Sequence, residues 1–83
     1  MAVKIVREVI GCPPKNYAGY GSIAMPMAIE FLDYNADQEA REEQCTVRKN
    51  NSETDGKNHY ERILTNKQGV DVVKFYLKFT QGK

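Results

Sequence analysis

Histidine and cysteine are scarce in this sequence, and their scarcity argues against the common metal-binding patterns. The 83 residues include one histidine, His59, and two cysteines, Cys12 and Cys45, which form no CxxC pair. Structural zinc sites draw their four ligands mainly from these two residue types. We therefore expect no metal and no cofactor. In a reducing cytoplasm the two cysteines stay as thiols, and we expect both to be small buried residues rather than a disulfide.

A set of catalytic residues is missing as well. Nucleophilic catalysis needs a nucleophile, a base within hydrogen-bond reach and a group that orients the base. His59 is the only imidazole available to Cys12 or Cys45, and neither spacing nor surroundings indicate such a pair. The glycine-containing segment at residues 11–22 has neither GxGxxG nor a Gly-Lys-Ser/Thr triplet, so it does not match a phosphate-binding loop. The sequence predicts a protein that is not an enzyme.

Long apolar segments are absent too. No run of about 18 apolar residues occurs, and Lys4, Arg7 and Glu8 interrupt the region where a signal peptide needs an apolar stretch. We expect a cytoplasmic protein that does not enter a membrane. The formal net charge is only +1, which argues against nucleic-acid binding through overall charge. The charge is uneven, because residues 35–44 carry four acidic residues against Arg41 alone, whereas residues 45–83 are basic on balance.

Alternation of apolar and polar residues is the strongest signal that is present. Every second residue from 73 to 79 is apolar, which is the period of a strand with one buried face. Residues 59–65 form a preceding strand, and the Asn-Lys-Gln-Gly sequence between the two is typical of a tight turn. A four-residue turn places Glu61 opposite Lys74 and puts Arg62 on the core face, and a one-residue bulge would shift this pairing.

The other elements are predicted from apolar alternation, turn residues and one helix signal. Pro13 and Pro14 end a first strand, because proline donates no hydrogen bond to a sheet. Asn35 is a suitable N-cap, and Gln38 completes a pattern like that of a capping box. The expected elements are strands at residues 3–10, 23–34 and 45–50, loops at residues 15–22 and 51–58, and a helix at residues 36–44.

These elements predict an α+β fold, mainly antiparallel β, as one small domain over residues 1–83. About five strands form a meander, with one short helix near residues 36–44. A competing interpretation makes residues 39–49 one exposed edge strand that pairs with residues 27–34. An exposed edge strand can also pair with a second copy of the chain, so a homodimer or another homo-oligomer is one expected partnership.

The segment at residues 15–22 has the composition of a recognition loop. Tyrosine supplies a large contact area and a hydroxyl group, while glycine and serine adapt to the partner. Lys15, Tyr17 and Tyr20 are therefore the candidate partner-binding residues. The main hypothesis is a small non-enzymatic accessory protein, of inhibitor type or subunit type, that occupies the surface of another protein. Phages and mobile elements commonly encode small proteins of this kind, which is an analogy only.

An alternative hypothesis assigns single-stranded nucleic-acid binding to the predicted C-terminal hairpin. One face of that hairpin carries positive charge between aromatic rings, which suits phosphates and stacked bases. Glu61 lies on the same face, and neither an RNP1-like nor a GXXG signature is present. The candidate nucleic-acid-binding residues are Lys57, His59, Lys74, Tyr76 and Lys78.

Overall fold

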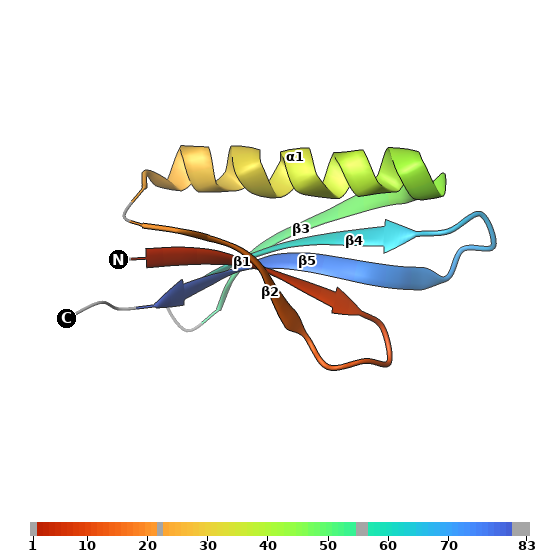
Figure 1. Ribbon diagram of the computed structural model, residues 1–83, viewed down its shortest axis with the longest axis horizontal. Coiled ribbons are helices and arrows are strands. Elements are labelled where there is room, and N and C mark those ends of the chain that lie inside the picture. Colours follow the sequence, from red (N-terminus) through yellow and green to blue (C-terminus); the bar gives the residue numbers. More distant parts are fainter. Residues whose placement is uncertain (1, 22, 55–56, 81–83) are drawn as a thin grey trace.

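One antiparallel sheet with a single helix along one of its faces makes up the described part of the chain (Figure 1). The computed structural model describes residues 2–21, 23–54 and 57–80. The sheet order is β2-β1-β5-β4-β3, so that β3, β4 and β5 form a meander and β1 returns beside β5. The elements are β1 (Ala2–Val9), β2 (Lys15–Tyr20), α1 (Met25–Glu43), β3 (Thr46–Thr54), β4 (Lys57–Thr65) and β5 (Asp71–Thr80).

The predicted α+β class with five strands and one helix is confirmed, but two segments were assigned wrongly. Residues 23–34 were expected to form a strand, whereas α1 begins at Met25 and runs through the predicted helix to Glu43. The competing edge strand at residues 39–49 is wrong for its first half for the same reason. Residues 15–20 form β2 instead of a loop. The loop expected at residues 51–58 is shorter, because β3 and β4 extend into it, and its Asp-Gly turn lies outside the described residues.

The buried face of the helix consists of three alanines and one leucine that recur every fourth position. Ala28, Leu32, Ala36 and Ala40 are all buried, and this spacing puts them on one face of a helix. Pro26 lies in the first turn, where its missing N–H has no helical partner to lose. The larger side chains between Met25 and Phe31 alternate like those of a strand, which explains the wrong assignment.

The helix ends where the backbone turns left-handed. Gln44 has φ 56° and ψ 44°, and its N–H donates to the carbonyl of Ala40. The following N–H, that of Cys45, donates to the same carbonyl at 2.8 Å. This termination directs the chain back along the sheet as β3.

A bulge lets β2 turn several side chains toward the helix. Ile5 pairs with Ala18 and Val6 with Asn16, so Tyr17 is an extra residue on its strand. A bulge reverses the alternation of sides at that point. Tyr17 therefore reaches the core, where its ring packs edge-on against Phe75 with ring centroids 5.4 Å apart.

The pairing of β4 with β5 differs from the prediction but keeps the predicted faces. Glu61 lies opposite Tyr76 rather than Lys74, and the register shifts between Leu64 and Thr65. Because Tyr76 and Lys74 are two positions apart, the side chains described for both strands stay on their expected side of the sheet. Lys74 still contacts Glu61, with 3.4 Å between Nζ and Oε2.

The core lies between the helix and the sheet. Its buried hydrophobic residues come from α1 and from β1, β4 and β5, and Arg62 of β4 is buried among them. The prediction that both cysteines are buried is wrong for Cys12, which is exposed, and both cysteines are free thiols. Among the described helical residues, no helix is long and apolar enough to cross a membrane. The buried core residues are Val3, Ile5, Ala28, Leu32, Ala36, Ala40, Leu64, Val73, Phe75 and Leu77.

Candidate functional site

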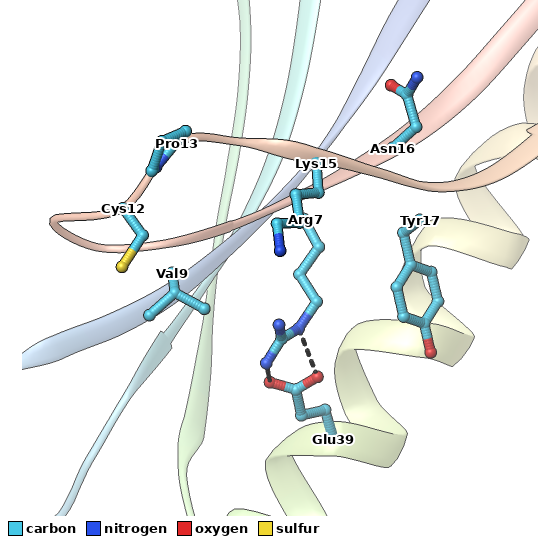
Figure 2. Close-up of a pocket in the computed structure, with 8 residues that line it drawn as sticks. All are labelled: Arg7, Val9, Cys12, Pro13, Lys15, Asn16, Tyr17 and Glu39. Atoms are coloured by element: carbon cyan, nitrogen blue, oxygen red, sulfur yellow. Dashed lines mark hydrogen bonds and ion pairs between the residues drawn. The ribbon is translucent and has the colours of Figure 1, made fainter.

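A groove opens between the β1–β2 hairpin and the second half of α1, and we call it the hairpin groove (Figure 2). Its volume is about 440 Å³. The lining residues come from three places that are distant in sequence: the end of β1, the start of β2 with its preceding turn, and the helix. They are Arg7, Val9, Cys12, Pro13, Lys15, Asn16, Tyr17 and Glu39.

A two-bond ion pair forms the floor of the groove. The Nε and Nη2 atoms of Arg7 each donate a hydrogen bond of 2.9 Å to one carboxylate oxygen of Glu39. Figure 2 shows the two side chains meeting between the hairpin and the helix. The hydrogen bond to Glu39 is the largest cause of an upward shift in the pKa of Arg7, and partial burial opposes it. The pair therefore holds α1 against β1 and fixes one wall of the groove relative to the other.

Lys15 and Tyr17 lie at the rim of the hairpin groove, beside the Arg7–Glu39 pair. Tyr17 is 51% exposed although its ring packs against Phe75, so the ring is anchored on one side and open on another. Lys15 is exposed and lies opposite Arg7 in the β1–β2 pairing. Two of the three residues chosen for partner contact from the sequence thus meet in one groove.

Tyr20, the third candidate, lies outside the groove. Its ring stacks on Phe31 of the helix with centroids 4.8 Å apart and planes inclined by 15°. Tyr20 is half-buried, and its ring packs against the hydrophobic core. Tyr20 therefore packs the start of α1 against β2, and its ring does not line the groove.

The hairpin groove is suited to contact and not to enclosure. Six of its eight lining residues are exposed, including Cys12 and Pro13. Sites for small molecules usually bury most of the ligand. Among the described residues, each fully buried side-chain nitrogen or oxygen has a hydrogen-bond partner, and three or more His, Cys, Asp or Glu side chains nowhere gather as they would around a metal.

Exposed apolar residues continue from the groove onto the adjacent end of the sheet. Val9 ends β1, and Ile10 follows it, with its N–H donating to the carbonyl of Val72. Val70, in the turn before β5, is 55% exposed. This end of the molecule therefore combines apolar surface with the charged and aromatic rim of the groove.

The residues of the nucleic-acid hypothesis lie on the other side of the sheet. Strand alternation turns Lys74, Tyr76 and Lys78 away from the helix, while the side chains of Lys57 and His59 lie outside the described residues. In the same layer, β1 contributes Lys4 and Val6, which lie opposite Lys78 and Tyr76. We call this surface the open face, consisting of Lys4, Val6, Glu8, Glu61, Lys74, Tyr76 and Lys78.

Sequence reasoning missed Arg7, Glu39 and Lys4 as members of these two surfaces. Arg7 and Glu39 meet only because α1 crosses the end of β1, and the segment before Glu39 was partly assigned to a strand. Lys4 joins Lys78 only because β1 lies beside β5. The alternation in β1 could have given the side of Lys4, but not its neighbouring strand.

The chain matches no protein-family model, no curated protein and no solved structure.

Proposed function

We propose that this protein is a non-enzymatic binding domain that contacts another protein through the hairpin groove and β2. The observation that carries the proposal is the meeting of Lys15 and Tyr17 above the Arg7–Glu39 pair in an open groove. An inhibitor or an accessory subunit works through such a surface, because it needs contact area and not a catalytic residue set.

The composition of the groove supports a protein partner. Aromatic residues at the centre of an interface contribute strongly to affinity, and Tyr17 offers its ring at little conformational cost because Phe75 already holds it. Exposed Val9 and Ile10 supply apolar area beside it. Lys15 adds a charge that can fix the orientation of an acidic group on the partner.

The position of β2 supports the same partner. β2 is the outermost strand, with β1 as its single described neighbour, so its outer backbone groups are available to an extended segment. The other edge, β3, carries Arg48 and Lys49, and charges of this kind discourage edge pairing. β2 has one charged residue, Lys15, at its start.

A cytoplasmic location belongs to this proposal. Both cysteines are free thiols, which is the state that a reducing compartment maintains. Exposed Cys12 would be vulnerable to oxidation in a secreted protein.

The exposed thiol of Cys12 allows a direct test from within the groove. A photoactivatable cross-linker is attached to Cys12 in a Cys45→Ala variant and irradiated in lysate of the source cells. The matched control carries the same cross-linker on Tyr34→Cys, in a chain that also has Cys12→Ser and Cys45→Ala. Tyr34 is 64% exposed on the helix and lies outside the groove.

The proposal expects one protein to be captured from the groove position and not from the helix position. With that protein purified, Tyr17→Ala should weaken binding roughly 30-fold, as loss of an interface hot spot does, while Tyr34→Ala leaves the affinity unchanged. Cross-linking to a second copy, together with a dimer in light scattering, would replace the foreign partner by a homodimer. Equal capture from both positions, or unchanged affinity for Tyr17→Ala, would refute the assignment of the groove.

A further inference from the structure

We infer that the open face binds single-stranded nucleic acid, with Lys4 and Lys78 on phosphates and Tyr76 against a base. This site lies on the side of the sheet opposite the helix and is independent of the hairpin groove. The inference rests on three observations: two like charges in register, an aromatic ring beside them, and a helix on the other face that is acidic on balance.

Lys4 and Lys78 lie directly opposite each other in the antiparallel pairing of β1 with β5. Side chains in such positions have Cβ atoms about 5 Å apart, and like charges there repel. Neither lysine forms an ion pair with the side chains that the structure describes. An anion between the two ammonium groups removes this repulsion, so the pair is complementary to a phosphate.

Space for that phosphate is available beside Lys4. Its neighbour on β2 is Gly19, which has no side chain on the open face. A Cβ atom added to Gly19 would meet no other atom within 4 Å. The glycine therefore leaves the sheet surface open next to the two ammonium groups.

Tyr76 supplies a ring at the same place. It lies two residues before Lys78 on β5, opposite Val6 of β1. Val6 is buried although it lies outside the main hydrophobic core, so the cross-strand neighbour of Tyr76 is an apolar residue shielded from solvent. Stacking of bases on such rings tolerates any sequence, because every base has an aromatic face.

Lys74, which the sequence suggested as a phosphate ligand, has a different role. Its Nζ lies 3.4 Å from Glu61 and 5.5 Å from the centre of the Tyr76 ring. Glu8 lies opposite Lys74 on β1, so a second carboxylate stands on the neighbouring strand. Lys74 thus contacts Tyr76 and Glu61, and the phosphate contact that the sequence assigned to Lys74 is assigned to Lys4 instead.

The charge of the helix layer sets the side on which a polyanion can approach. α1 carries six carboxylates and one arginine, Arg41, and it covers only the other face of the sheet. Two of the carboxylates, Asp33 and Glu39, are paired with arginines of the sheet, so the helix remains acidic on balance. A nucleic acid is repelled from that layer and is directed to the open face. The six acidic residues of the helix are Glu30, Asp33, Asp37, Glu39, Glu42 and Glu43.

The test measures fluorescence anisotropy of a labelled oligothymidylate of about 15 nucleotides between roughly 50 and 200 mM salt. Lys4→Glu and Lys78→Glu should each weaken binding about tenfold and reduce the slope of log affinity against log salt by about 0.7, because each removes one phosphate contact. Tyr76→Leu should weaken binding about tenfold with an unchanged slope.

Two matched variants control for charge and for loss of an aromatic ring. Lys67→Glu makes the same charge change in the exposed turn at the opposite end of β5 and should leave affinity and slope unaltered. Tyr34→Leu removes an exposed ring from the helix and should have no effect. Circular dichroism checks each fold, and Lys4→Gln and Lys78→Gln repeat the test with smaller changes.

Several results would overturn the inference. Failure of the unmodified protein to bind the oligothymidylate at the lowest salt is one, and equal losses from Lys67→Glu and Lys78→Glu are another. Equal affinity for a duplex of the same length would exclude base stacking on Tyr76. Inorganic polyphosphate that competes as well as unlabelled oligothymidylate would reduce the site to one for phosphate alone. None of these results bears on the hairpin groove.

Discussion

Arg62 of β4 reaches across the core and donates a hydrogen bond from Nε to the carboxylate of Asp33 on α1. The arginine is only 1% exposed, whereas the side chain of Asp33 retains 26% exposure. Nη1 of Arg62 donates two further hydrogen bonds, to Asn51 Oδ1 at 2.8 Å and to the Glu61 carbonyl at 2.9 Å. A buried positive charge is tolerated here because its partners are fixed in place.

Removal of the Asp33 carboxylate should therefore be costly. We expect Asp33→Ala to lower the free energy of unfolding by about 3–5 kcal/mol, because it leaves Arg62 buried without its counter-charge. Urea denaturation measures the loss, and Glu30→Ala, at an exposed position of the same helix, is the control. Replacing both Asp33 and Arg62 with apolar residues should recover much of the loss. Equal stability of Asp33→Ala and Glu30→Ala would show that the buried pair is unimportant.

The Arg7–Glu39 pair should stabilise the fold without a pH dependence of its own near neutrality. A folded-state pKa raised above the ordinary value favours folding at every pH below that value, and this stabilisation disappears only as pH rises through the folded-state pKa. We expect Arg7→Gln to cost about 1 kcal/mol, equally at about pH 6 and pH 9 and less in about 1 M salt. Thermal unfolding at the two pH values checks this, and a cost that disappears at the higher pH would contradict it.

Close approach of the helix should make Ala36 intolerant of larger residues. Ala36 is 0% exposed in the middle of the contact with the sheet. Ala36→Leu should destabilise the protein by about 1–3 kcal/mol, because the added atoms force the helix away from the sheet. Gln38→Leu, exposed on the same helix, is the control for the change in helix-forming tendency. Denaturant midpoints that shift equally for the two variants would argue against tight packing at Ala36.

The end of α1 offers a substitution that should increase stability. Gln44 has a φ of 56°, a conformation that glycine adopts without the strain felt by other residues. Gln44→Gly should raise the free energy of unfolding by about 0.5–1 kcal/mol, whereas Gln44→Ala should not. Differential scanning calorimetry compares the two variants with the parent, and a lower melting temperature for Gln44→Gly would disprove the assignment of strain.

The sequence predicted most of the sheet because its signals are local. Alternation over residues 73–79 predicted β5. The predicted register of β4 against β5 was wrong by two residues, and an even error leaves each described side chain on its predicted face of the sheet. The burial of Arg62, which looked like a conflict in the sequence, is resolved by Asp33 and Asn51. Neither partner could be chosen from the sequence, because both depend on where α1 and β3 lie.

The bounds of the helix and the position of the candidate groove could not be predicted from the sequence, because both depend on contacts between distant segments. Larger side chains between residues 25 and 31 alternate like those of a strand. Three of the four residues on the buried face of α1 are alanines, which give a weak hydrophobic signal. Residues 15–20 become a strand only through pairing with β1. Lys15 and Tyr17 were identified from composition, but their placement above Arg7 and Glu39 is a product of the tertiary fold.

Three of the four buried residues of α1 are alanines, and this composition affects how firmly the helix is held in position along the sheet. The methyl groups of Ala28, Ala36 and Ala40 bring the helix near the sheet, and Leu32 is the one large side chain among the four buried residues of this face. Asp33 and Glu39 lie about 9 Å apart along the helix axis, and each is gripped by an arginine from a different strand. Together with the packing of Leu32, these two ion pairs fix the position of α1 along its own axis relative to the sheet.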